Sequence, residues 1–136
     1  MPHKAKPAFP PLVLEWFDRG VQELETANLL FESSGHTGIV AVHIHQAAEK
    51  YLKGYLVLKG VVPKKTHDLG HLLQNALAFD PALKAFEDYC DVTTRYYLAD
   101  RYPSGNAPRY SRDEMVKSIT NLKKLIAVLT CWVISQ

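Results

Sequence analysis

Arginine and tyrosine side chains are concentrated in one stretch of the sequence, residues 95–112. Four of the chain's five arginines and four of its seven tyrosines fall there. Guanidinium groups present planar donors to phosphate and tyrosine rings stack on bases, so the stretch is predicted to bind nucleotide or RNA. The alternative is structural: Tyr96 and Tyr97 close the end of the core, and the arginines pair with nearby acids (Asp88, Asp91 or Asp100).

A second polar stretch, residues 45–54, stands between apolar residues on both sides. It reads His-Gln-Ala-Ala-Glu-Lys-Tyr-Leu-Lys-Gly and is predicted to form a narrow polar stripe on the central helix of a bundle. The stripe is expected to meet a partner, a ligand or solvent. Glu49 and Lys53 are four residues apart, in the order that favours an ion pair on a helix surface. A solvated, salt-bridged edge is the simplest interpretation of Glu49, Lys50 and Lys53.

The remaining candidate constellations point to no cofactor. His67 and His71 stand four residues apart, the spacing of a metal pair on a helix, but no third ligand accompanies them at helical spacing. The sequence has no Gly-rich phosphate loop, and no serine or cysteine nucleophile with recognisable helpers. Neither a metal nor another cofactor is expected.

Length and composition are those of one globular domain. The chain has 136 residues, of which 47% are hydrophobic and 22% charged, enough to fill one core. The formal net charge of only +2 gives no overall field that attracts nucleic acid. Residues 95–136, however, hold seven bases against three acids, so this half of the chain is predicted to offer a basic face to an anion.

Cysteine usage and hydropathy favour a cytoplasmic protein. Cys90 and Cys131 form no metal-binding spacing and are expected to be buried thiols in a reducing compartment. The first residues lack an apolar segment of signal-peptide length, and the apolar run from Leu125 to Ile134 is well short of a membrane span. A membrane partner is therefore not expected.

The spacing of apolar residues predicts an all-α fold, an up-and-down four-helix bundle with one additional short helix. A proline-rich N-terminal tail is expected over residues 1–11, followed by the bundle domain over residues 12–136. Within the domain, long helices are predicted over residues 11–33 and 37–59, from Asp80 and from Ser111, with the short helix beginning at Thr66.

Local signals set the beginnings of the later helices. Thr66 is predicted to cap the short helix, and Asp80 followed by Pro81 is typical of a helix start. Ser111 and Glu114 have the spacing of a capping box. Prolines and glycine between residues 101 and 110 predict an irregular connection before the last helix.

Three motifs occur in order along the chain: the stretch from His45 to Gly54, the segment from Thr66 to Leu73 that begins Thr-His-Asp-Leu, and Arg101-Tyr-Pro103. Together they resemble the HEPN domain family of bacteria and archaea over about residues 12–135. The resemblance implies a four- or five-helix bundle that forms a homodimer. It also implies a minimal nucleotidyltransferase as partner, in a toxin–antitoxin arrangement.

Many members of this family are metal-independent ribonucleases that carry an Arg-x4-6-His motif at the end of the third long helix. One branch extends the motif to Arg-x4-His-x-Tyr, and its partner transfers AMP to that tyrosine. In this sequence Arg95 and Tyr102 match, whereas Asp100 stands where the histidine belongs. The resemblance thus implies Arg95 and Asp100 as the catalytic positions. The arginine- and tyrosine-rich stretch adds Arg101, Tyr102 and Arg109 as nucleotide- or RNA-binding positions. Glu49, Lys53 and His67 are expected to support the site.

The aspartate changes the expected chemistry, because histidine transfers protons near neutral pH whereas an aspartic acid is a poor acid there and its charge repels phosphate. Three hypotheses follow. The favoured one is a HEPN protein that binds nucleotide or RNA as the toxin-like component of a nucleotidyltransferase–HEPN pair, with cleavage weak or absent because Asp100 replaces the motif histidine. The second is an active ribonuclease toxin that uses Asp100, or a histidine such as His67 from elsewhere in the fold. The third is a dimeric interaction module without catalysis.

Overall fold

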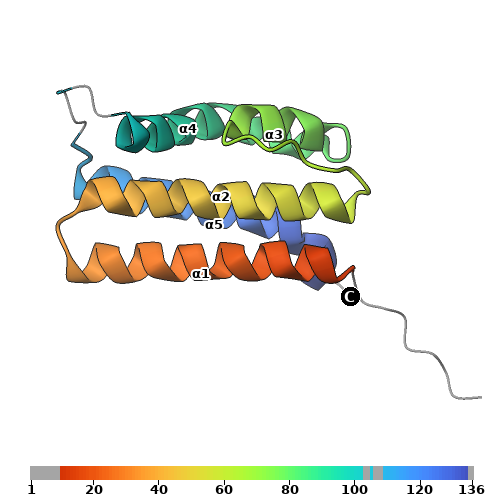
Figure 1. Ribbon diagram of the computed structural model, residues 1–136, viewed down its shortest axis with the longest axis horizontal. Coiled ribbons are helices and arrows are strands. Elements are labelled where there is room, and N and C mark those ends of the chain that lie inside the picture. The colour runs from red at the N-terminus through yellow and green to blue at the C-terminus, as the bar shows by residue number, and fades with distance from the viewer. Residues whose placement is uncertain (1–9, 103–104, 106–108, 135–136) are drawn as a thin grey trace, which may run out of the picture.

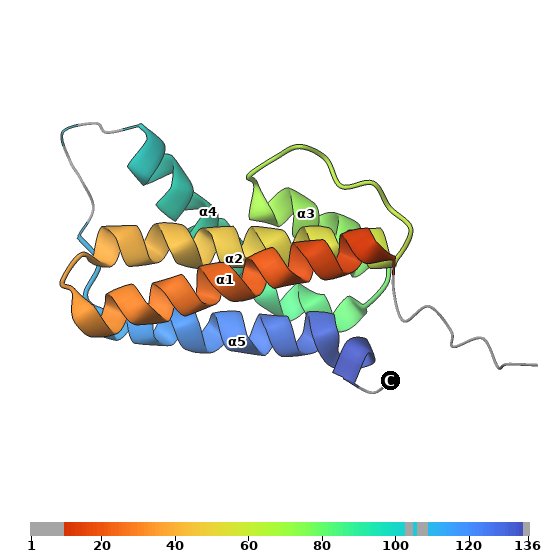
Figure 2. The same cartoon turned by 60° about the horizontal axis from the view of Figure 1, so that its bottom comes forward.

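The fold is a bundle of α-helices, seen here in a computed structural model that describes residues 10–102, 105 and 109–134 (Figure 1). Those residues contain no β-strand. The elements are α1 (Pro11–Ser33), α2 (Thr37–Leu58), α3 (Leu69–Leu77), the 3-10 helix η1 (Pro81–Phe86), α4 (Glu87–Arg101) and α5 (Arg112–Ile134). The long helices α1, α2, α4 and α5 alternate in direction, and α3 is the short additional one (Figures 1 and 2). The predicted all-α up-and-down bundle is confirmed.

Helices α1 and α2 form an antiparallel pair that is packed closely enough to require two glycines. A Cβ atom at Gly20 would lie 2.7 Å from the ring of Tyr51, and one at Gly54 would lie 2.7 Å from the ring of Phe17. These two rings also stack on each other, with centroids 5.6 Å apart. The pair therefore locks α1 against the half of α2 that carries the polar stripe.

Helix α2 lies at the centre of the bundle, between α1, α5 and the layer made by α3 and α4 (Figure 2). Thirteen of its residues are buried, and they include one histidine and two residues with charged side chains: His45, Glu49 and Lys53. The solvated edge predicted for Glu49 and Lys53 is therefore wrong. The reason is that two other segments contact this face of α2. His67, in the connection before α3, bonds to Glu49, and the centre of the Trp16 ring on α1 lies 5.5 Å from the Lys53 ammonium.

The segment from Thr66 to Arg101 differs from its predicted boundaries at three points. Asp68, not Thr66, caps α3, because its side chain accepts a hydrogen bond from the backbone N–H of His71. Asp80 caps the 3-10 helix η1, and α4 begins only at Glu87. Arg101 is the last residue of α4 and not part of an irregular connection.

The predicted connection and tail fall partly outside the described residues, which leave out residues 103–104, 106–108 and 1–9. Pro11, expected to end the tail, is the first residue of α1. Of the two thiols expected to be buried, Cys90 is buried and Cys131 is exposed. Among the described helices, none combines the length and the apolar character needed to cross a membrane.

Helix α5 begins as predicted, since the backbone N–H of Glu114 donates to the hydroxyl of Ser111 over 3.0 Å. Its first residue, Arg112, also contacts the end of α1, which lies at the same end of the bundle. The guanidinium of Arg112 donates to the carbonyl oxygens of Phe31 (2.9 Å) and Ser34 (3.4 Å) and lies 4.1 Å from the centre of the Phe31 ring. Arg112 thus holds the end of α1, where carbonyl groups lack partners within the helix.

Candidate functional site

Glu49 is the buried centre of a polar cluster on α2. Only 2% of the residue is exposed, and its carboxylate accepts hydrogen bonds from Lys53 Nζ (3.1 Å) and His67 Nδ1 (2.7 Å). Lys50 Nζ lies 3.7 Å away. The expected pairing of Glu49 with Lys53 is confirmed, although it occurs inside the protein and not on its surface. A buried charge needs such partners, because burial without them is costly.

The charge on Glu49 is maintained by these partners. Burial by itself would raise the pKa of the carboxyl group, but the hydrogen bond from His67 and the charges of Lys53 and Lys50 outweigh it and hold the pKa below its ordinary value of 4.5. Glu49 is therefore an anion at neutral pH. It acts as a fixed hydrogen-bond acceptor for the imidazole of His67.

His67 approaches Glu49 from the connection that precedes α3. Its side chain is 50% exposed, so one ring nitrogen is engaged inside the protein while part of the ring meets solvent. Because the Glu49 carboxylate can only accept, Nδ1 of His67 carries the hydrogen, and in the neutral ring Nε2 carries the lone pair. This carboxylate–imidazole pair is the main chemical feature of the described structure.

His45 holds the backbone of His67 in place. Its Nε2–H donates to the carbonyl oxygen of His67 over 2.8 Å. The ring of His45 is fully buried, and among the described residues no partner reaches its Nδ1. Burial lowers the pKa of His45 below 6.5, outweighing the hydrogen bond to His67. His45 is thus a neutral structural histidine.

Tyr97 joins the end of α4 to this cluster. Its ring stacks on His67, with centroids 4.3 Å apart, and on His45, with centroids 5.0 Å apart. The guanidinium carbon of Arg101 lies 5.6 Å from the centre of the Tyr97 ring, as expected for residues four apart on one helix face. We call the group formed by Glu49, Lys53, His67, Tyr97 and Arg101 the His67 site.

The His67 site brings together four of the residues predicted from the sequence and adds one. Glu49, Lys53 and His67, expected only to support a site, form its interior, and Arg101 lies at its edge. Tyr97 was expected to close the core and was not assigned to a site. The signal for this arrangement is the spacing of His45, Glu49 and Lys53, which are four residues apart and so share one face of α2.

The other predicted site residues lie on the surface near the end of α4. Arg95, Asp100 and Arg109 are exposed, and Tyr102 is 69% exposed. Arg95 precedes Tyr97 by two residues, so it points to a different side of α4. No described contact joins Arg95, Asp100, Tyr102 or Arg109 to the His67 site, so their predicted roles stay predictions.

The alternative, structural interpretation of the arginine- and tyrosine-rich stretch holds for one tyrosine. Tyr96 is buried, packs edge-on against Tyr110 with centroids 4.8 Å apart, and donates to Glu114 over 3.4 Å. Within the described part of the chain, no arginine of this stretch forms an ion pair with an aspartate. The stretch is thus divided between core closure, at Tyr96, and the His67 site, at Tyr97 and Arg101.

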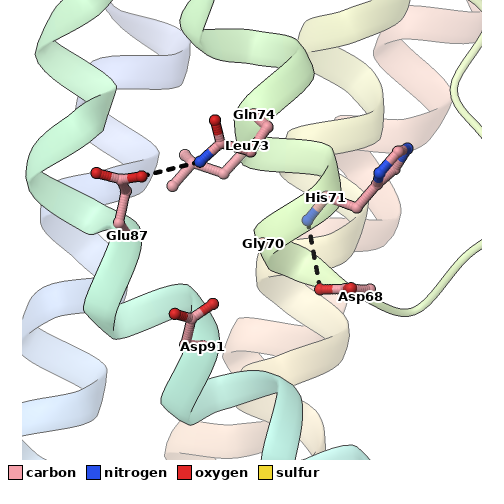
Figure 3. Close-up of a pocket in the computed structure, with 7 residues that line it drawn as sticks. All are labelled: Asp68, Gly70, His71, Leu73, Gln74, Glu87 and Asp91. Carbon is pink, nitrogen blue, oxygen red and sulfur yellow. Dashed lines mark hydrogen bonds between the residues drawn. The ribbon is translucent and has the colours of Figure 1, made fainter.

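A separate pocket of about 300 Å³ lies between α3 and α4. Three acidic residues and four others line it (Asp68, Gly70, His71, Leu73, Gln74, Glu87 and Asp91; Figure 3). His71 does not share a face with His67, which precedes α3, and Figure 3 shows its ring turned away from Glu87 and Asp91. Among the described residues, no three side chains of the metal-binding types come together as a metal site would require.

The helix order and packing define an up-and-down helical bundle with an internal carboxylate–imidazole pair. A family model for the HEPN domain matches residues 13–132, nearly the range expected from the sequence. The chain therefore belongs to the HEPN domain family, and this membership supports a function related to nucleotides or RNA.

Structural comparison gives the same fold. The crystal structure of TT1696 from Thermus thermophilus superposes with a TM-score of 0.75 and 22% sequence identity, over 86% of this chain and 94% of that one. At this identity the likeness concerns the fold alone. A comparison with curated proteins gives no match.

Proposed function

We propose that this HEPN protein binds nucleotide or RNA at the His67 site, as the toxin-like component of a nucleotidyltransferase–HEPN pair. The observation that carries the proposal is that Arg101 and His67 both contact the ring of Tyr97. The guanidinium carbon lies 5.6 Å from the centre of that ring, and the imidazole centroid lies 4.3 Å from it. A guanidinium, an aromatic ring and an imidazole at one place supply the groups that nucleic acids use: donors for phosphate and flat faces for bases.

The surroundings of the site favour an anionic ligand. Arg101 lies at the end of α4, and Lys50 is partly exposed beside Glu49. Arg95, Tyr102 and Arg109 are also exposed, although Arg95 points to a different side of α4 from Tyr97. In the proposal these three residues contact the backbone or bases of a ligand longer than one nucleotide.

Two further parts of the proposal come from membership of the family: a homodimer, and a nucleotidyltransferase partner. Sedimentation velocity at micromolar concentration tests the first, and a monomer would contradict it. Co-purification with the nucleotidyltransferase encoded beside the gene tests the second. Tyr102, 69% exposed at the end of α4, is accessible to such a partner.

Binding is tested by fluorescence anisotropy with a labelled single-stranded RNA and, separately, a labelled ATP. Arg101→Ala is expected to weaken binding about tenfold or more, since hydrogen bonds to charged groups contribute about 1.5–3 kcal/mol. Arg19→Ala is the matched control, because Arg19 is exposed on α1 and pairs only with Glu15 in the described structure. Equal affinity of Arg101→Ala and wild type would remove Arg101 from the site. No binding by wild type would favour an interaction module without a ligand.

A further inference from the structure

We propose that the groove between α4 and α5 binds a small amphipathic anion, a molecule with one charged group and an apolar body. The groove has a volume of about 540 Å³, within the range of small-molecule sites in proteins. Residues of η1 and α4 form one wall, and residues of α5 form the other. None of them belongs to the His67 site, so the proposal is independent of nucleotide or RNA binding.

The groove exists because α4 and α5 both pack on α2 but, within the described part of the chain, scarcely on each other. Two tyrosines of α4 that line the groove also bond across to α5. The Tyr89 hydroxyl donates to the carbonyl oxygen of Ser118 over 3.0 Å, and the Tyr96 hydroxyl donates to Glu114 over 3.4 Å. These bonds join the two helices and fix both rings in the lining.

The wall formed by η1 and α4 is mainly apolar and aromatic, with Phe86, Tyr89, Val92 and Tyr96 in it. Val92 is 40% exposed, so part of this apolar surface meets solvent in the free protein. Burial raises the pKa of Tyr96 to about 12 and also raises the pKa of Tyr89, so neither phenol is charged at neutral pH. Such a surface favours an apolar or aromatic body, which is stabilised by removal from water.

The α5 wall supplies the charge that complements an anion. Lys117, Asn121 and Lys124 line it and are four and three residues apart, so they share one face of the helix. Each lysine lies about 4.5–6 Å along the helix from Asn121, a distance that a lysine side chain can span. Both ammonium groups and the amide can therefore donate to one anionic group placed over Asn121. Among the described residues, no acid forms an ion pair with either lysine.

Two acids of the groove limit the charge of the ligand. Asp88 is exposed on the α4 side and would repel a second anionic group there. Glu114, on the α5 side, accepts the hydrogen bond from Tyr96. A ligand with one anionic end at α5 and an uncharged body along α4 fits this distribution. A nucleoside triphosphate, with several negative charges, fits it poorly.

The binding test uses the full chain and two anions, anilinonaphthalene sulfonate and octanoate. The fluorescence of the sulfonate is expected to rise on binding, and octanoate should displace it. Octanol has the same chain without the charge, so it should compete about tenfold less well than octanoate. Because the two lysines are exposed, added salt should weaken the binding of both anions.

Substitutions of lysines test the charged wall. Lys117→Gln/Lys124→Gln should weaken the binding of octanoate about tenfold and remove most of its advantage over octanol. Lys123→Gln is the matched control, because Lys123 is an exposed lysine of α5 that does not line the groove. Its affinity for octanoate should equal that of wild type.

Substitutions of valines test the apolar wall. Val92→Glu places a charge beside the apolar body and should weaken the binding of both anions about tenfold or more. Val116→Glu is the matched control, because Val116 is 49% exposed on α5 and does not line the groove. Both positions are partly exposed, so neither variant is expected to unfold the protein.

Any of three results would overturn the proposal. Failure of wild type to bind either anion at millimolar concentration would favour a protein partner or a second copy as the occupant of the groove. Equal effects of the groove variants and their controls would place the bound anion elsewhere on the protein. Displacement of the sulfonate by ATP but not by octanoate would identify a nucleotide site instead.

Discussion

The rings of His67 and Tyr97 stack with centroids 4.3 Å apart and planes inclined by 25°. One ring comes from the connection before α3 and the other from the last turns of α4. Through this contact the three stretches that resemble HEPN motifs converge, because His67 also bonds to Glu49 on α2 and Tyr97 also contacts Arg101. Motifs that are separate in the sequence are therefore parts of one site.

The buried pair of Glu49 and Lys53 is expected to couple strongly. Glu49→Gln leaves Lys53 buried without its acid and should lower the free energy of unfolding by about 3 kcal/mol. In the double variant Glu49→Gln/Lys53→Met no charge is left uncompensated at these two positions. The loss in free energy of unfolding of the double variant, measured by urea denaturation, should therefore be smaller than the sum of the losses of Glu49→Gln and Lys53→Met.

Additive losses would show that Glu49 and Lys53 do not interact in solution.

The pH dependence of stability gives an independent check on Glu49. Since the pKa of Glu49 in the folded state lies below 4.5, its contribution to stability is present above about pH 4.5 and is lost as the pH falls through the folded-state value. The Glu49→Gln variant should lack that acid-dependent loss.

His45 should make stability depend on pH in a higher range. Its folded-state pKa lies below the ordinary 6.5 because the ring is buried. Below pH 6.5 the unfolded chain then binds more protons at this histidine than the folded chain does. The free energy of unfolding should therefore decrease as the pH is lowered, by up to about 1.4 kcal/mol per pH unit. Denaturation between pH 7.5 and 5 measures this slope. His45→Gln keeps a donor for the His67 carbonyl, does not titrate, and should reduce the slope; parallel curves would contradict the prediction.

The two glycines between α1 and α2 should not tolerate a methyl group. In Gly20→Ala and Gly54→Ala the new Cβ would lie 2.7 Å from the rings of Tyr51 and Phe17, which are stacked and cannot move apart freely. Each variant should lose about 1–2 kcal/mol, even after a gain of about 1 kcal/mol in helix propensity. Gly38→Ala is the control, because nothing lies within 4 Å of a Cβ there, and thermal denaturation should show no loss.

Arg112 should contribute to stability although it is exposed. Its guanidinium bonds to two carbonyl oxygens at the end of α1 and stacks on Phe31, so Arg112→Ala should cost about 1–2 kcal/mol. Arg112→Lys should recover only part of this, since an ammonium group lacks the planar fork. Arg19→Ala removes an exposed ion pair with Glu15 and should cost less than about 0.5 kcal/mol. Equal losses for Arg112→Ala and Arg19→Ala would mean that the Arg112 contacts are not stabilising.

The helices could be predicted from the sequence because their signals are local. Apolar periodicity and the ends of the pattern place α1 over residues 11–33, as the structure has it, and α2 to within one residue at its end. The hydroxyl of Ser111 caps α5 at the predicted place. Where two capping residues compete, as Thr66 and Asp68 do, the sequence alone does not decide between them.

The interior of the site could not be predicted, because it depends on contacts between distant segments. Glu49 and Lys53 have the spacing of an exposed ion pair, but Glu49 is bonded to His67 and the Lys53 ammonium lies over the Trp16 ring, and both residues are buried. Tyr97 and Tyr96 are neighbours with the same side chain, yet one lies at the site and the other in the core. The orientation of α4 about its own axis relative to α2 determines which tyrosine faces the site. No local pattern in the sequence predicts that orientation.

His67 is held at its carbonyl oxygen, at Nδ1 and over one face of its ring. With three anchors on α2 and α4, His67 is fixed independently of the exposed part of the connection around Val62, which is 90% exposed. We therefore expect insertions and deletions at that point to leave the imidazole where it is. A loop of different length in a related chain would be no sign that the pair has been lost, and a tag or label placed at Val62 would report on the protein without disturbing it.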